Sequence, residues 1–250
     1  HLLLVADIGQ RDGKPARFFG TNLGGRDVAP SKELSPLLAA RFAKFGVNMI
    51  RLHAFDSTYS GILDYSGGTT QEFDLQGLDR MDYLIAQLKK QGIYVYIDLL
   101  DYRRFTSADG VKHADQFTHN WAGSMKGASI FDQRMIELQK DYATQLLTHR
   151  NPYTKLRYVD DPAIAVVEMT NENSLFYFLL NKDLSLPYYR DELARRWNRW
   201  LASRYPDRSA LARAWTDAGG QCELFDDEDP TDQTVKLPSA ELTRFSKGLA

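Results

Sequence analysis

The sequence predicts an α/β fold with a parallel sheet, either closed into a barrel or covered by helices on both faces. Short apolar runs of strand length alternate with longer segments of helical periodicity, and these runs are apolar on both faces. Strands that alternate with helices of this size form right-handed βαβ crossovers. Near-continuous apolar runs are typical of strands that are buried on both sides.

Four strands carry this prediction, at residues 16–23, 47–55, 94–100 and a run from Ala163 that ends at Glu172. Helices are expected between them, at about residues 35–45, 75–91 and 131–148. Leu78, Met81 and Ile85 show the helical spacing of apolar residues most clearly.

The alternation stops after the fourth strand. Residues 188–205 and 209–215 predict two helices, with three tryptophans expected in their core: Trp197, Trp200 and Trp215. Residues 226–232 are acidic and broken by proline, which predicts a loop, and residues 239–249 predict a further helix. A complete eight-stranded barrel takes about 250 residues, whereas four strands occupy about 170 residues here. The fold is therefore either something smaller or the N-terminal portion of a longer barrel.

Composition excludes several classes of function. The 31 basic and 33 acidic residues are spread along the chain, so neither nucleic acid nor a membrane surface is expected as a partner. The single cysteine, Cys222, allows no intrachain disulfide and no structural zinc site. His113 and His119 lack ligand partners at metal-binding spacing, and nothing else in the sequence requires a metal or a cofactor. No signal-peptide core is visible, yet we expect a secreted or periplasmic protein.

The end of the fourth strand is the most informative part of the chain. Its apolar run leads to Asn171 and Glu172, and ligands gather at the carboxyl ends of parallel strands. We predict Glu172 as a proton donor in a partly desolvated pocket and Asn171 as a hydrogen-bonding partner of a substrate hydroxyl. Both side chains reach one cavity only if the strand turns or bulges there. The alternative is a strand-end turn that faces solvent.

Arg51 and His53 share one face of the second strand. A buried guanidinium is costly unless it is paired, so Arg51 implies a nearby carboxylate. Glu168 is expected to lie deeper than Glu172 and to pair with a donor such as Arg51. The alternative is that Arg51 belongs to a purely structural pair. Asp56 follows the strand and is either a substrate ligand or the cap of the next segment.

The ends of the first and third strands supply further candidates for substrate binding. Asn22 and the pair Asp101-Tyr102 are expected at the same level as Glu172, where they would line the same mouth. Turn formation explains Asn22 almost as well. Tyr102 and Trp121 are candidates for aromatic surfaces on which a sugar ring stacks, and the alternative for both is packing.

Four segments resemble retaining glycoside hydrolases with a β/α barrel: FFGTNL, KFGVNMIRLHAFD, LKKQGIYVYIDL and HRNPYTKLRYVDDPAIAVVEMTNENSL. They resemble the N-terminal half of the clan typified by glycoside hydrolase family five, over about residues 16–175. The Asn171-Glu172 pair is most specific when it is taken together with Gly20-Thr21-Asn22 and Arg51. The resemblance favours a TIM-type barrel, present as its N-terminal half with a helical insertion after strand four.

This resemblance implies a role for each matched residue. Glu172 would be the general acid/base, Asn171 would contact the hydroxyl next to the anomeric carbon, and Arg51 would hydrogen-bond the nucleophile. His53 would line the subsite. In such enzymes the two carboxylates lie roughly 5 to 5.5 Å apart and the reaction proceeds with net retention. The nucleophile of the family is a Glu near the end of strand seven, which we expect downstream of this chain.

We therefore expect one incomplete catalytic barrel domain over residues 1–250. Strands one to four occupy about residues 16–175, the insertion about 176–237, and the start of the next helix 238–250. The hypothesis is hydrolysis of β-linked glycosidic bonds of a polysaccharide or oligosaccharide. The alternatives are a barrel that binds glycans without hydrolysing them and a metal-dependent barrel enzyme. We also expect the isolated chain to be poorly soluble or inactive, because it would expose sheet edges and half a core.

Overall fold

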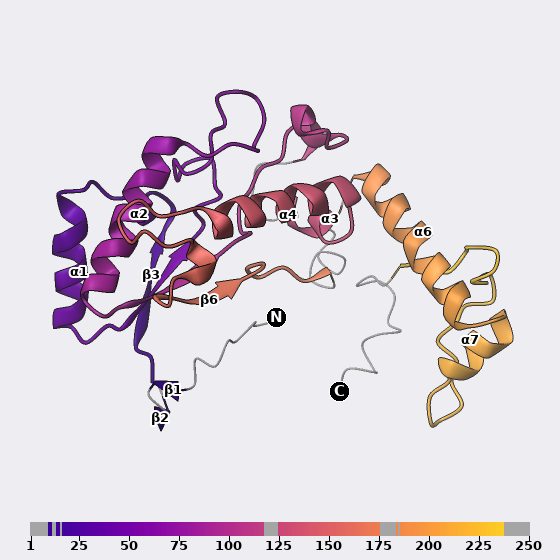
Figure 1. The fold of residues 1–250 in the computed structure, drawn as a ribbon. Coiled ribbons are helices and arrows are strands. Elements are labelled where there is room, and N and C mark those ends of the chain that lie inside the picture. Colours follow the sequence, from indigo (N-terminus) through magenta and orange to yellow (C-terminus); the bar gives the residue numbers. More distant parts are fainter. Residues whose placement is uncertain are drawn as a thin grey trace. The chain divides into compact units, whose positions relative to one another are not determined.

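The computed structural model describes residues 10–11, 14–15, 17–117, 125–175, 184 and 186–237. It divides into two compact units. The first unit, residues 1–115 and 133–173, contains a four-stranded sheet in the order β3-β4-β5-β6. All neighbouring strands are parallel, and each lies beside the strand that precedes it in sequence, as in a (β/α) barrel (Figure 1).

The sheet strands are β3 (Gly20–Gly24), β4 (Met49–His53), β5 (Tyr94–Asp98) and β6 (Ile164–Glu168). The connecting helices are α1 (Leu34–Lys44), α2 (Leu75–Lys90) and α4 (Gln133–Thr148). The four predicted strands and three predicted helices are thus confirmed, with strands that are shorter than expected. Two antiparallel two-residue strands precede the sheet, β1 (Gln10–Arg11) and β2 (Lys14–Pro15). Short 3-10 turns lie at Gly25–Val28, Ser107–Asp109, Ala114–Gln116 and Tyr158–Asp160.

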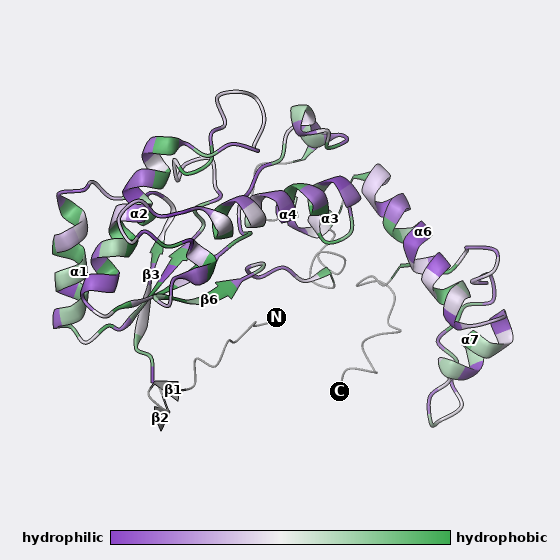
Figure 2. Ribbon diagram, viewed as in Figure 1, coloured by the Kyte–Doolittle hydropathy of each residue, from purple (hydrophilic) through white to green (hydrophobic). Residues whose placement is uncertain are grey.

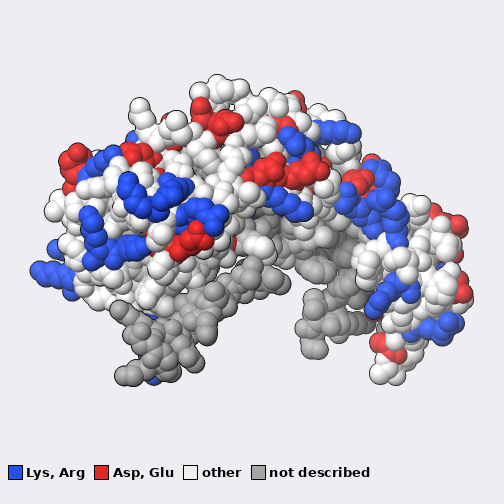
Figure 3. All heavy atoms as spheres, viewed as in Figure 1, with Lys and Arg blue, Asp and Glu red and all other residues white. Residues whose placement is uncertain are grey.

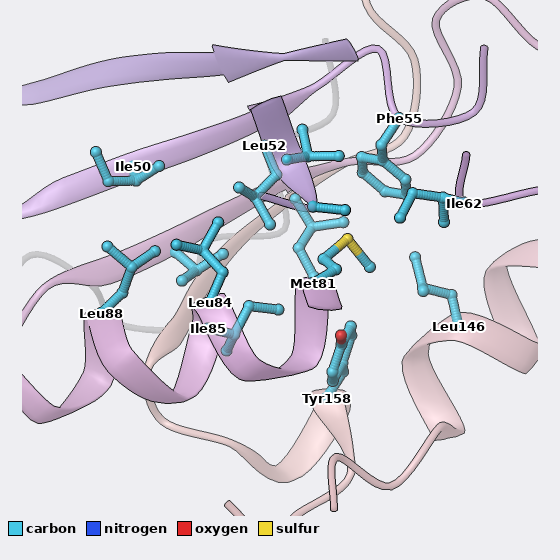
Figure 4. Packing of buried hydrophobic residues seen from close by; sticks show 14 of the residues in the cluster. Ile50, Leu52, Phe55, Ile62, Met81, Leu84, Ile85, Leu88, Leu146 and Tyr158 are labelled. Atoms are coloured by element: carbon cyan, nitrogen blue, oxygen red, sulfur yellow. The ribbon is translucent and has the colours of Figure 1, made fainter. Parts of the chain in front are cut away.

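The main hydrophobic core lies between one face of the sheet and its helices. Ile50 and Leu52 of β4 point toward Met81, Leu84 and Leu88 of α2 (Figure 4). Residues of α1, α4 and the other strands complete the same buried cluster. Because neighbouring side chains of a strand alternate between faces, this packing turns the intervening residues toward the opposite face. Within the described part of this unit the helices that join this core pack on one face only, which favours the barrel over a sheet covered on both sides.

A close approach between two glycines fixes the start of α2. Asp74 caps the helix by accepting a hydrogen bond from the backbone N–H of Gly77, at 2.5 Å. A Cβ atom on Gly77 would lie only 1.6 Å from the carbonyl oxygen of Gly61. No side chain fits there unless the backbone moves.

We therefore expect Gly77→Ala to lower the free energy of unfolding by about 3 kcal/mol or more, as overpacking against a rigid carbonyl does. Alanine is a better helix former than glycine by about 1 kcal/mol. If the space beside Gly77 were open, the substitution would therefore raise the free energy of unfolding. Urea denaturation measures the change. Gly67→Ala is the matched control, because a Cβ there meets no atom within 4 Å. Equal unfolding midpoints for the two variants would contradict the packing described here.

The second unit, residues 116–132 and 174–250, contains helices followed by turns and irregular chain over residues 215–237. Its helices are α3 (Lys126–Ser129), α6 (Pro187–Arg204) and α7 (Arg208–Ala214). A small core of Leu201, Leu211, Leu224 and Val235 packs against Trp197 and Trp215. The helix predicted at 239–249 lies outside the described residues.

The three tryptophans form one stack. The ring of Trp197 lies 5.5 Å from that of Trp200 and 6.2 Å from that of Trp215, nearly parallel to both. The prediction that these residues form the core of the insertion is confirmed for Trp197 and Trp215. Trp200 covers the end of the stack and is 52% exposed.

Charged side chains of both signs are mixed on the visible surface of the molecule. On the face seen in Figure 3, Lys and Arg side chains lie among Asp and Glu side chains. Figure 2 shows β6 in hydrophobic colours and α6 mostly in hydrophilic ones. No described helix has the length and apolar character to cross a bilayer.

Candidate active site

The face of the sheet opposite the helices carries polar side chains. Arg51 of β4 is paired in register with Tyr96 of β5, and Asp98 of β5 is paired with Glu168 of β6. Their neighbours in sequence, such as Leu52 and Ile97, belong to the apolar core. The alternation of the strands therefore gathers a guanidinium, a phenol and two carboxylates on this face.

Arg51 is the centre of this group. One of its terminal nitrogens, Nη2, donates to Glu168 Oε2 at 2.5 Å, to Asp98 Oδ2 at 3.0 Å and to Asn171 Oδ1 at 2.8 Å. The Tyr96 hydroxyl donates to the same Glu168 oxygen at 2.9 Å. The predicted carboxylate partner of Arg51 is thus confirmed, and Glu168 is one of two such partners.

His53 links two carboxylates on the same face. Its Nδ1 lies 2.6 Å from Asp98 Oδ2, and its Nε2 lies 3.1 Å from Asp101 Oδ2. Asp101 in turn accepts a hydrogen bond from Asn171 Nδ2 at 3.0 Å. Together with the Arg51 contacts, these interactions close a ring through five side chains: Arg51, Asp98, His53, Asp101 and Asn171.

Burial raises the pKa of Asp98 to about 8, because lost hydration outweighs the attraction of Arg51, and neighbouring carboxylates act in the same direction. The second oxygen of Asp98, Oδ1, is buried without a hydrogen-bond partner among the described residues.

The ligand atoms of His53, Asp98 and Asp101 lie within 4.8 Å of one another, a spacing that could surround a metal ion. Searched over the described residues, this is the one such group that the chain offers. The same side chains make hydrogen bonds with one another, with Arg51 and with Asn171, and His53 Nε2 adds a close contact with Asp101. The group is thus part of a polar network.

Asp56 is buried beneath the loop after β5, which argues against the first of its two expected roles, that of a substrate ligand. Its side chain is 1% exposed and accepts hydrogen bonds from the backbone N–H groups of Asp101, Tyr102 and Arg103. Burial raises the pKa of Asp56 to about 6, although the N–H groups of Tyr102 and Asp101 pull it down. Asp56 thus shapes the loop after β5 that carries Asp101, and its carboxylate faces the backbone of that loop.

The chain turns sharply at Glu172. Such a turn is needed if the neighbouring side chains of Asn171 and Glu172 are to reach one cavity. Ladder hydrogen bonds continue past β6, from Leu99 N–H to Glu168 O and from Asn171 N–H to Leu100 O, both at 2.9 Å. Glu172 then adopts φ +44°, a left-handed conformation that is rare outside glycine. The side chain of Glu172 is exposed. The desolvated pocket expected around it is therefore not formed by the described residues, and its catalytic role remains a proposal.

The remaining predicted residues have mixed outcomes. Asn22 is the third residue of β3 and is paired with Arg51, so it lies deeper than expected and not at the level of Glu172. Tyr102 is half-buried, and its ring lies 6.5 Å from that of His53, edge to face. Its role as a sugar platform stays a prediction. Trp121 lies outside the described residues.

Asp98 and Tyr96 are the members of the site that sequence reasoning missed. The signal was present in the period of two along β5, where Tyr94, Tyr96 and Asp98 alternate with apolar residues. That parity places Asp98 on the same face as Arg51 in the neighbouring strand.

The order and parallel pairing of the strands define the fold as part of a (β/α) barrel. The chain superposes on the endo-1,4-beta-mannanase from Rhizomucor miehei with a TM-score of 0.52 and 20% identity, covering 74% of this chain and 54% of that one. The glycoside hydrolase family 5 mannosidase from the same organism gives a TM-score of 0.50 and 17% identity, over 69% of this chain and 49% of that one. These similarities confirm the predicted partial barrel.

The sequence is similar to named plant proteins. It is 31% identical to mannan endo-1,4-beta-mannosidase 2 of Arabidopsis thaliana over 137 residues, which cover 52% of this chain and 30% of that protein. It is 30% identical to mannan endo-1,4-beta-mannosidase 3 of Oryza sativa subsp. japonica over 138 residues, covering 53% and 28%. The match thus spans about 30% of the length of these curated relatives. No family model matches the sequence. The resemblance to the N-terminal half of family-five-like glycoside hydrolases is confirmed.

Proposed function

We propose that this chain carries the acid/base half of the active site of a retaining glycoside hydrolase that cleaves β-1,4-linked mannan. The observation that carries the proposal is the placement of Asn171 and Glu172. Asn171 is held by Arg51 and Asp101 at the carboxyl end of β6, and the chain turns directly after it to present Glu172. The relatives named as mannan endo-1,4-beta-mannosidases support the choice of substrate.

In this proposal Glu172 protonates the departing glycosidic oxygen and then, as a base, activates the water that releases the product. Asn171 binds the hydroxyl next to the anomeric carbon. The nucleophile is a second carboxylate that lies outside this chain. The other carboxylates near Arg51 are poor candidates for it, because Asp56, Asp98, Asp101 and Glu168 are engaged with protein groups. A polysaccharide substrate of this kind also favours a secreted or periplasmic location.

The experiment is a hydrolysis assay of the purified full-length protein on mannan, glucan, xylan and galactan. We expect release of oligosaccharides from β-mannan, and anomeric proton NMR of the first product should show the β-anomer, since two displacements retain configuration. Initial formation of the α-anomer would exclude the retaining mechanism. Binding of mannan without hydrolysis would instead support the glycan-binding barrel.

A further inference from the structure

We propose that His53 and Asp101 are positioning residues, which orient the Asn171 amide through a closed ring of polar contacts and do not themselves bind the sugar. The ring runs from Arg51 through Asp98, His53 and Asp101 to Asn171 and back to Arg51. This inference rests on the proposed function, because Asn171 stands beside the proposed acid/base.

The first step concerns the orientation of the amide. Asn171 Oδ1 accepts from the Arg51 guanidinium at 2.8 Å, and Asn171 Nδ2 donates to the Asp101 carboxylate at 3.0 Å. A flipped amide would place its NH2 group beside a guanidinium and its oxygen beside a carboxylate. Both contacts would be repulsive, so the charges on either side select one orientation.

The second step concerns what holds Asp101 in place. Its backbone N–H donates to Asp56 Oδ2 at 2.7 Å, which anchors the main chain. Its carboxylate then lies between Asn171 Nδ2 and His53 Nε2. His53 is therefore the side chain that fixes the direction of the carboxylate that orients Asn171.

The third step concerns whether His53 contacts the substrate directly. Both of its ring nitrogens face carboxylate oxygens, at 2.6 Å for Nδ1 and 3.1 Å for Nε2. A sugar hydroxyl could reach a ring nitrogen only by displacing one of these carboxylates. The geometry thus points to a role through Asn171, where the resemblance alone implies a residue that lines the subsite.

The ring makes a specific prediction about Asp101. Asp101→Asn keeps an oxygen that accepts from Asn171, although its NH2 group replaces the oxygen that faces His53 Nε2. Asp101→Ala removes both contacts. We expect the asparagine variant to retain kcat within about threefold and the alanine variant to lose roughly 10- to 100-fold, the scale of a small misplacement of a binding group.

The test is a double-mutant cycle in the full-length protein, with an aryl β-mannobioside as substrate. His53→Ala and Asp101→Ala should each lower kcat by roughly 10- to 100-fold with KM changed by less than about threefold. In the Asn171→Ala background the same changes should cost less than about twofold more, because residues that act through one partner are not additive. Losses that multiply fully in that background would overturn the proposal and leave the proposed function intact. His113→Asn, at an exposed histidine of the same unit, is the control and should leave kcat unchanged.

A second readout needs no turnover and separates failure of this proposal from failure of the proposed function. The ¹⁵N–¹H resonances of the Asn171 side-chain amide, assigned by their loss in Asn171→Ala, should shift in His53→Ala and Asp101→Ala but not in His113→Asn. Unchanged resonances in both alanine variants would overturn the ring even if the protein hydrolyses nothing.

Discussion

Glu172→Gln is expected to lower kcat of the full-length protein on unactivated β-mannan by roughly 10³-fold, within the range that a positioned general acid supplies. Glutamine keeps the size of the side chain and can adopt the same backbone, but it cannot transfer a proton to the departing sugar oxygen. The measurement is the release of reducing ends from mannan. KM should change little, because the exposed carboxylate makes no contact that glutamine would remove among the described residues.

The leaving group makes this result specific. In an aryl mannobioside with an acidic phenol, the phenolate leaves without being protonated. The loss of kcat should therefore be much smaller for that substrate. Glu172→Ala should also be partly rescued by azide on the same substrate, since azide replaces the water that the missing base no longer activates. Glu72→Gln, at an exposed glutamate of the same unit, is the control. Unchanged mannan hydrolysis by Glu172→Gln would remove Glu172 from the mechanism.

Arg51→Met is the second large effect, and it concerns stability as well as activity. The arginine donates to Asp98 and Glu168, whose side chains are 0% and 14% exposed, and it holds the Asn171 amide. Methionine fills the same space but leaves Glu168 without its cation and Asp98 and Asn171 without a hydrogen-bond donor. Removing one partner of a buried pair costs several kcal/mol. Because Arg51 itself is 17% exposed, we expect a loss of about 2 to 4 kcal/mol in the free energy of unfolding.

Urea denaturation at neutral pH measures this loss, and two further variants interpret it. Arg51→Lys keeps the charge and should lose less stability than Arg51→Met, although lysine lacks the planar fork of arginine. Arg157→Met breaks an exposed ion pair with Asp160 and should change stability little. If Arg51→Met is as stable as Arg157→Met, the network around Arg51 does not hold the sheet together.

The strands and helices of the first unit were predictable because their signals are local. The apolar spacing through Leu78, Met81 and Ile85 predicts α2 to within one residue of its end at Lys90. The pairing of Arg51 with Glu168 was also predictable, since a guanidinium on a barrel face needs a carboxylate. Both predictions follow from physical rules that apply within an element or across one face.

Other parts of the site depend on register, which the sequence of one strand does not contain. Asn22 was expected at the mouth, but the parallel pairing of β3 with β4 places it beside Arg51. The sequence favours a cap over a ligand only slightly for Asp56, and the three N–H groups of the loop after β5 around its carboxylate are not visible in it. The surroundings of Glu172 depend on more distant contacts still, and its exposure could not be predicted from residues 163–173 alone.

The single Arg51 nitrogen that serves Glu168, Asp98 and Asn171 has a consequence for ligand exchange. An Nη2 atom carries two hydrogens, so three acceptors must share them and at least one is held at less than full strength. An arriving hydroxyl can donate to whichever oxygen is least well served, without first breaking a complete bond. The oxygens around Arg51 can therefore accept a hydrogen bond from a ligand hydroxyl while the guanidinium stays in place.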